Sequence, residues 1–162
     1  MPSKRFSLGA LALLLVLGCQ QGLEESQYQS LSDALWDKDR TLEFQFTPQD
    51  TLSDHHIFIN LRNDNAYPFA NLFLITEMEF PTGQMVTDTL EYDMALPSGE
   101  WLGQGTGSIK ENKLWYKENI VFPSSGVYTL RISHAMRDNG SIPGVKLLPG
   151  ITDVGFQIEK TE

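Results

Sequence analysis

Apolar and polar residues alternate with a period of two along most of the chain. Leu42, Phe44 and Phe46 alternate with polar residues in 41–47, and similar patterns return in six later stretches. Successive side chains of a β-strand point to opposite faces, so each stretch predicts a strand with a buried face. The predicted strands cover residues 41–47, 57–61, 72–80, 85–94, 114–122, 127–136 and 151–160, with a further extended segment at 101–109.

Turn-forming residues separate these stretches. Pro81-Thr82-Gly83 predicts a hairpin between 72–80 and 85–94, and Asp138-Asn139-Gly140-Ser141 predicts a turn. Apolar residues on both faces of 72–80 indicate a central strand, and residues 117–119 interrupt their stretch like a β-bulge. About eight strands without a long amphipathic helix predict an all-β fold. We expect an antiparallel β-sandwich of jelly-roll or immunoglobulin-like type.

The first nineteen residues have a different pattern. Lys4 and Arg5 precede an apolar run of about ten residues, which is too short for a membrane-spanning helix because that needs about twenty. The run ends in Val16-Leu17-Gly18-Cys19, as in a lipoprotein signal peptide. We expect residues 1–18 to be removed and Cys19 to carry the lipid. The alternative is an ordinary signal cleavage site beside a buried thiol.

The remaining chain divides into two parts. Residues 19–40 are polar and acidic, without apolar alternation, and we expect a lipidated N-terminus and tether. Trp36 is expected to mark the point at which the tether docks onto the domain. Residues 41–162 form the predicted β-sandwich domain. Removal of the first 18 of the 162 residues leaves 144, which suits one domain with its own core.

The charge of the chain restricts its partners. Removal of residues 1–18 takes away Lys4 and Arg5 and no acid, so the formal net charge goes from -9 to -11. Such an acidic surface repels phosphate, so we expect no nucleic acid partner, and membrane contact through acyl chains rather than a basic patch. Cys19 is the one cysteine, so no disulfide is expected.

No residue pattern predicts a catalytic or metal site. His55 and His56 are adjacent and point to opposite faces of a strand, and His134 has no spaced partner, so we expect no metal. Glu77 and Glu79 could serve a glycosidase, although a solvated sheet face is the simpler interpretation. No serine lies in a nucleophile elbow. We therefore expect neither an enzyme nor a bound cofactor.

Two further patterns could indicate binding sites. Glycines 103, 105 and 107 resemble a nucleotide-binding loop only in their spacing, because the segment leads into a strand and not a helix. Large aromatic residues could form a platform that stacks sugars, although most are expected in the core. They are Trp101, Trp115, Tyr67, Tyr92, Tyr116 and Tyr128. Glycan binding therefore stays open as the alternative function.

Several short motifs, in their order along the chain, resemble the gliding motility lipoprotein GldH family of the Bacteroidetes. They are Leu61-Arg62-Asn63, then Tyr67-Pro68-Phe69-Ala70-Asn71-Leu72-Phe73, Gly99-Glu100-Trp101-Leu102-Gly103-Gln104-Gly105, His134-Ala135-Met136-Arg137 and Gly150-Ile151-Thr152-Asp153-Val154-Gly155. The resemblance covers nearly all of the chain after Cys19. It implies a cell-envelope lipoprotein of the gliding machinery, which in that phylum is linked to type IX secretion, and it carries no catalytic residues.

The motif residues allow two interpretations. They could form a hydrogen-bonded corner that fixes the crossing of strands, which we favour, or a loop that contacts a partner. The residues concerned are Arg62, Asn63, Tyr67, Pro68, Asn71 and Trp101. From the sequence we expect a non-enzymatic lipoprotein that docks envelope proteins. We expect Cys19 to hold it in the outer rather than the inner membrane.

Overall fold

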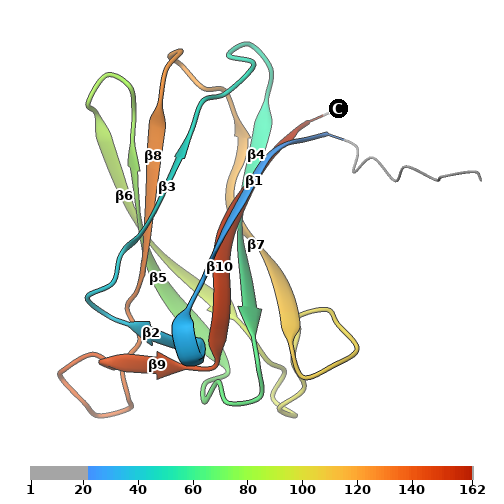
Figure 1. Ribbon diagram of the computed structural model, residues 1–162, viewed down its shortest axis with the longest axis vertical. Coiled ribbons are helices and arrows are strands. Elements are labelled where there is room, and N and C mark those ends of the chain that lie inside the picture. The colour runs from blue at the N-terminus through green and yellow to red at the C-terminus, as the bar shows by residue number, and fades with distance from the viewer. Residues whose placement is uncertain (1–21, 162) are drawn as a thin grey trace, which may run out of the picture.

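The computed structural model describes residues 22–161 as two four-stranded antiparallel sheets that face each other (Figure 1). The first sheet has the order β1-β10-β4-β7, the second β3-β8-β5-β6, and β2 pairs with β9 at one end. The strands are β1 (Leu23–Ser30), β2 (Leu35–Asp37), β3 (Leu42–Phe46), β4 (His55–Asn63), β5 (Asn71–Glu79), β6 (Met85–Asp93), β7 (Lys110–Ile120), β8 (Tyr128–His134), β9 (Leu147–Pro149) and β10 (Ile151–Lys160). A 3-10 turn, η1 (Ser32–Ala34), follows β1.

The predicted alternation is confirmed in the strands. In β3, Leu42, Phe44 and Phe46 are buried while Glu43 and Gln45 are exposed. All seven alternating stretches contain a strand, and the antiparallel sandwich is confirmed. Strand β5 lies between β8 and β6, as expected for a central strand, and it forms the predicted hairpin with β6.

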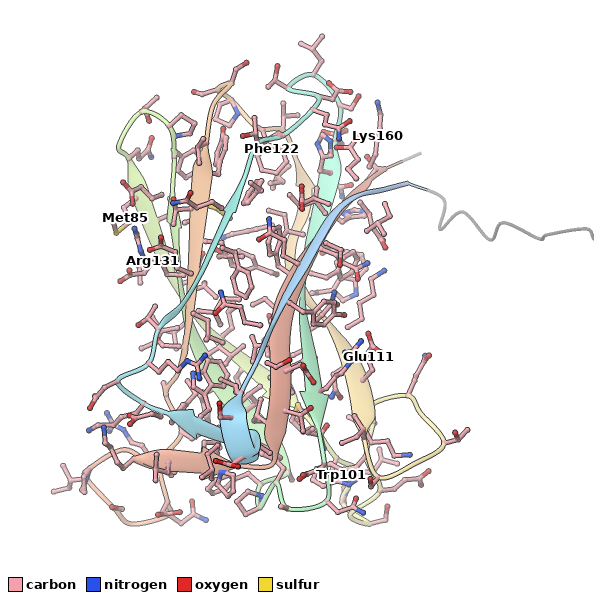
Figure 2. The ribbon with its side chains drawn as sticks, viewed as in Figure 1. Met85, Trp101, Glu111, Phe122, Arg131 and Lys160 are labelled. Carbon is pink, nitrogen blue, oxygen red and sulfur yellow. The ribbon has the colours of Figure 1, made fainter. Side chains whose placement is uncertain are left out.

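The core fills the space between the two sheets, as Figure 2 shows. Phe46 stands at its aromatic centre, with ring centroids 5.5 Å from Tyr128, 5.7 Å from Phe122 and 5.2 Å from Phe156. These rings come from four strands or loops of both sheets. Because large aromatic side chains bury the most area, this cluster ties the sheets together.

The prediction of a tether over residues 19–40 needs correction, because part of this segment is folded. Residues 23–30 form β1, which pairs with β10, and Trp36 in β2 is fully buried. Apolar alternation does not reveal β1, because the side chains that it directs toward β3 are the amides of Gln27 and Gln29. Gln27 and Gln29 donate through Nε2 to the carbonyls of Gln45 and Glu43 in β3, each at 2.7 Å. The folded domain therefore includes residues 23–40.

Two local features also differ from a simple strand pattern. Residues 101–109, expected to be extended, form a loop with isolated bridges at Trp101 and Gln104, so that prediction was wrong. The loop leads into β7 and not into a helix. The bulge expected at 117–119 is present, because the β4–β7 register shifts beside Ile57 and Asn119 has a positive φ of 49°.

Gly155 is needed where β10 pairs closely with β1, because Gly155 lies opposite Tyr28. A Cβ atom on Gly155 would overlap the Gln27 carbonyl oxygen and lie 2.8 Å from Cδ1 of Tyr28. A glycine inside a strand often marks such a close approach.

No helical segment in residues 22–161 has the length and apolar character to cross a membrane.

We expect Gly155→Ala to lower the free energy of unfolding by about 1–3 kcal/mol, because the added methyl group pushes β1 away from β10. Urea denaturation measures the change. Gly107→Ala is the matched control, since a Cβ there meets open space, and it should change the free energy by less than about 0.5 kcal/mol. Equal effects of the two substitutions would contradict the close approach of β1 to β10 at Gly155.

Candidate functional site

The motif residues meet at a corner between β4 and β5. Tyr67 is buried, and its hydroxyl donates to the Asn71 carbonyl at 2.6 Å across the turn. The Tyr67 N–H donates to the Asp64 carbonyl at 3.3 Å, and the Asp64 N–H donates to the Gly150 carbonyl at 2.9 Å. Burial raises the pKa of Tyr67 above its usual value, so its hydroxyl stays a donor. These bonds close the corner without a ligand.

Gly150 holds three segments together at this corner. Its φ is +84°, and a Cβ atom would overlap the backbone of Tyr67. Its N–H donates to the Ala34 carbonyl at 2.8 Å, which fixes η1 against the start of β10. Only glycine combines this backbone conformation with so close an approach.

Trp101 and the buried amides complete the corner. The Trp101 indole N–H donates to Oδ1 of Asn65 at 3.1 Å, and its ring lies 6.1 Å from that of Tyr67. Asn112 of β7 donates to Oδ1 of Asn63 at 2.9 Å, with both amides buried. The structure thus places Asn63, Tyr67 and Trp101 at one corner, where Asn63 and Tyr67 both donate to the Asp64 carbonyl and Trp101 donates to the neighbouring Asn65. Trp101 lies at the end of the sandwich shown at the bottom of Figure 2.

Pro68, Asn71 and Arg62 have other surroundings. Pro68 is exposed, and the Asn71 amide donates to Glu91 of β6 at 3.1 Å. Arg62 points to the outer face of the first sheet, where its guanidinium carbon lies 4.7 Å from the ring centroid of Tyr28. Arg62 is therefore not part of the buried corner.

Tyr28 crosses the outer face of the first sheet from β1 to β7. Its hydroxyl donates to Oε1 of Glu111 at 2.9 Å, and Glu111 also lies 3.5 Å from Nε of Arg62. Burial and the bond to Glu111 raise the pKa of Tyr28 to about 12. The missing side chain of Gly155 gives the Tyr28 ring the space to lie there.

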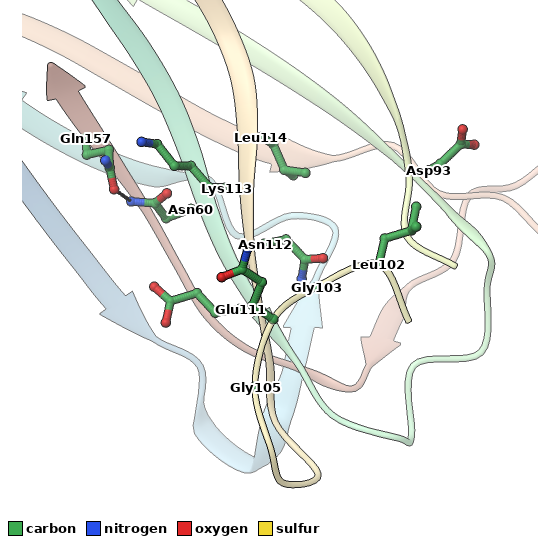
Figure 3. Close-up of a pocket in the computed structure, with 11 residues that line it drawn as sticks. Asn60, Asp93, Leu102, Gly103, Gly105, Glu111, Asn112, Lys113, Leu114 and Gln157 are labelled. Carbon is green, nitrogen blue, oxygen red and sulfur yellow. Dashed lines mark hydrogen bonds between the residues drawn. The ribbon is translucent and has the colours of Figure 1, made fainter. Parts of the chain in front are cut away.

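A polar pocket of about 570 Å³ opens beside β7 (Figure 3). Asn60 is 1% exposed and donates to Oε1 of Gln157 at 2.7 Å, and Lys113 reaches Oε1 of Glu159 at 2.7 Å. Leu102 and Asp93 lie on the other side of β7 in the same picture. The volume suits a small ligand, but Asn60, Gln157 and Lys113 already have side-chain partners.

The aromatic residues do not form a flat platform. Tyr67, Tyr116 and Tyr128 are buried, whereas Trp115 is 50% exposed. The Trp115 ring is tilted by 49° against Phe58. Sugar rings stack on flat exposed surfaces, so the expected core location holds for most of these residues and one indole stays accessible.

The histidines and carboxylates lie apart from one another. His55 is buried beside Glu24 at 3.1 Å, while His56 on the opposite face accepts from the Asn119 N–H, so the predicted opposite orientations are confirmed. His134 bonds the Trp36 carbonyl at 3.1 Å, and burial lowers its pKa. Among residues 22–161, no group of three potential metal ligands comes together.

The carboxylates of β5 belong to the outer face of the second sheet. Glu79 pairs with Arg131 at 2.9 Å, and Glu43 pairs with the same guanidinium at 2.9 Å. Glu77 lies opposite Arg131 in the β5–β8 register. This is the solvated face that the sequence favoured over a pair of catalytic acids.

Strand β6 is the edge strand of the second sheet. The Phe80 N–H donates to the Gln84 carbonyl at 2.8 Å, and the Met94 N–H to the Ala70 carbonyl at 2.7 Å. Even-numbered residues of β6 therefore bond β5, and the backbone groups of odd-numbered residues point outward. The outward residues are Met85, Thr87, Thr89, Glu91 and Asp93. Within residues 22–161, nothing hydrogen-bonds their backbone groups.

The other sheet edges are at least partly covered. Gln27 and Gln29 seal β1 against β3, as described above. On β7, Gln104 pairs with Glu111 through two backbone bonds of 2.8 Å, and the Tyr92 hydroxyl donates to the Trp115 carbonyl at 2.6 Å. Exposed edges invite pairing with another strand, so β6 is the candidate docking edge.

Sequence reasoning missed several of these residues. Tyr28 and Gln27 lay in the segment expected to be a tether, and the β6 edge follows from sheet order alone. Gly155 carried a usable signal, because it is a glycine inside the predicted strand 151–160. Cys19, the expected lipid attachment site, lies outside the described residues.

Comparison with known proteins places the chain among lipoproteins. A family model described as GldH lipoprotein matches residues 24–158. The gliding motility lipoprotein GldH homolog of Christiangramia forsetii is 48% identical over 150 residues, covering 93% of this chain and 91% of the relative. The gliding motility lipoprotein GldH of Flavobacterium johnsoniae is 45% identical over 152 residues, covering 94% of each chain.

Among solved structures, the infectious bursal disease virus VP2 subviral particle matches with a TM-score of 0.42 and 12% identity. The match covers 86% of this chain and 34% of the viral chain. A second structure of that virus, the Gx strain, matches with a TM-score of 0.40 and 12% identity, covering 86% of this chain and 33% of the viral one. This chain thus spans about a third of the viral chains that it matches.

Removal of the Tyr67 hydroxyl tests the corner. We expect Tyr67→Phe to lower the free energy of unfolding by about 1 kcal/mol, because the Asn71 carbonyl loses its donor. Tyr92→Phe is the control, since its bond to the Trp115 carbonyl is exposed and water can replace it. Thermal or urea unfolding should show the larger loss for Tyr67→Phe, and the reverse order would argue against the corner as a structural unit.

Proposed function

We propose, from the premise that this chain belongs to the GldH lipoprotein family, that it is a non-enzymatic docking component of the cell envelope. Family membership supports a membrane-anchored lipoprotein associated with gliding motility. The docking role, and a link to type IX secretion through the same assembly, are the proposed part. The partners are other envelope proteins, and the outer membrane is the proposed location.

The open edge of β6 is the observation that carries the docking role. Five outward residues present unpaired backbone groups along nine residues of strand. A partner segment that adds as a further strand would satisfy these groups, as in recognition by strand addition. Glu91 and Asp93 lie on this edge with Glu77 on the neighbouring strand, so a basic partner segment fits best.

Catalysis and glycan binding find less support in the geometry. Glu79 is held by Arg131 in a solvated face, and the exposed Trp115 lacks a coplanar neighbour. The corner residues are occupied with one another. The family resemblance therefore reflects architecture at Asn63, Tyr67 and Trp101, and function is assigned to the anchor and to the edge.

Lipid attachment at Cys19 is tested first. Cys19→Ala should leave the domain folded, because Cys19 precedes β1 and the folded residues, and should move the protein out of the membrane fraction or stall its maturation. Fractionation, fatty-acid labelling and mass spectrometry of the N-terminus are the measurements. Wild-type protein that stays in the membrane with an unmodified thiol would argue against the anchor.

Docking is tested by a proline at the centre of the edge. Thr89→Pro removes an outward N–H that does not bond β5, and proline is tolerated on edge strands, so the fold should persist. We expect envelope partners recovered with the wild-type protein to fall by about tenfold, corresponding to roughly 1.4 kcal/mol of binding free energy.

Thr89→Ala is the matched control because it keeps the N–H and should retain the partners. Affinity purification after cross-linking in cells, with quantification of each protein, is the measurement. Equal recovery with Thr89→Pro and Thr89→Ala would move docking away from β6. Absence of any specific partner of the wild-type protein would remove the docking role itself.

A further inference from the structure

Two loops at one end of the sandwich carry no charged residue. The loops 47–54, 80–84 and 121–127 lie at this end, together with the start of β1 and the end of β10 (Figure 1). Register agrees, because Phe46 pairs with Tyr128, and Lys160 pairs with His55. In a chain of net charge -9, the loops 80–84 and 121–127 contain no charged residue.

Apolar side chains project from these loops. Leu52 is 89% exposed, Val127 54% and Val121 43%, and Pro81 is exposed beside them. Two of the loops touch, because a Cβ atom on Gly126 would lie 2.8 Å from Cβ of Pro81. Single exposed apolar residues are common, but several on two uncharged loops and the neighbouring Leu52 form a surface that water does not favour.

Loop 47–54 contains two acidic residues, Asp50 and Asp54, and Asp50 is bonded to the end of β10. The Asp50 carboxylate accepts from Nζ of Lys160 at 2.8 Å and from the Ser53 hydroxyl at 2.5 Å. The Leu52 N–H donates to Oδ1 of Asp50 at 2.7 Å, which closes a turn with the leucine side chain outside. Asp50 is therefore neutralised at the base of the loop, and its pKa is lowered by these bonds.

The lipid anchor joins the protein at the same end. The Gly22 carbonyl accepts from the Lys160 N–H at 2.8 Å, so residue 22 is fixed to the end of β10. Two residues, Gln20 and Gln21, lie between Cys19 and Gly22, and the three Cα–Cα steps of that segment span at most about 11 Å. A lipid on Cys19 thus keeps this end within a short distance of the bilayer. This proximity rests on the proposed lipid anchor at Cys19.

We propose that this end is a membrane-contact surface, at which Leu52, Val121 and Val127 enter the interface of the bilayer that holds the Cys19 lipid. The partner is a lipid surface, and the contact is apolar, because the chain offers no basic patch there. The sandwich then stands upright, with its strands directed away from the membrane. The β6 edge faces sideways and the Tyr67 corner points outward.

The opposite end is the natural comparison. Ile142 is also 89% exposed, but charged residues flank its loop at Arg137, Asp138 and Lys146. It lies beyond β8, at the far end from the start of β1 (Figure 1). Leu52 and Ile142 are equally exposed. What distinguishes them is their position in the fold relative to the proposed lipid anchor.

Depth-dependent quenching tests the proposal on the lipidated protein. Leu52→Cys gives a single free thiol, because the Cys19 sulfur carries the lipid, and this thiol is labelled with the dye NBD. The protein is reconstituted in phosphatidylcholine vesicles that contain a nitroxide-labelled lipid. We expect a blue-shifted emission and loss of most of the fluorescence at position 52.

Ile142→Cys, labelled in the same way, is the matched control and should keep its emission and intensity. Equal quenching at the two positions in protein that floats with the vesicles would overturn the membrane-contact surface and leave the anchor standing. Failure of both labelled proteins to float with the vesicles would overturn the anchor, and the contact surface with it. Val127→Cys provides a second position that should follow Leu52→Cys.

Discussion

The fold depends on how its sheet edges are closed. Two sheets with one apolar face each can bury those faces against each other, but every edge strand still presents unpaired backbone groups. On one side, Gln27 and Gln29 of β1 donate to the carbonyls of β3 and seal the two edges together. On the other side, Gln104 and Tyr92 cover parts of β7. Within residues 22–161 the outward backbone groups of β6 stay unpaired, and this is the edge that we propose for docking.

Buried polar contacts fix the end of the sandwich far from the anchor. Gly150 admits the backbone of Tyr67, Tyr67 closes its turn on Asn71, and Asn112 joins β7 to Asn63. Each polar group finds a partner within the protein, so these motif residues specify the strand crossing and leave little to offer a ligand. A motif shared across a family can thus report on a common scaffold, while contacts with partners use a surface without such a motif.

The two ends of the sandwich and the β6 edge have different proposed roles in an anchored domain. With the proposed lipid on Cys19, the two residues between Cys19 and Gly22 would keep the end that carries Leu52 close to the bilayer, and the end with the Tyr67 corner would extend from it. An upright sandwich exposes β6 along its length to proteins beside it. Acyl chains supply the membrane affinity, since the acidic surface gains nothing from anionic lipids.

The sequence by itself determined the all-β class, the seven alternating strands, the bulge near Asn119 and the resemblance to the GldH family, because each depends on neighbours along the chain. It also favoured a structural corner over a partner-contact loop for Arg62, Asn63, Tyr67, Pro68, Asn71 and Trp101, which stays a prediction. It missed β1, because amides on an inward face give no apolar alternation. Sheet order, the overlap at Gly155 and the open edge of β6 depend on which distant strands pair. Only the tertiary structure decides these, since edge status is a property of neighbours in space.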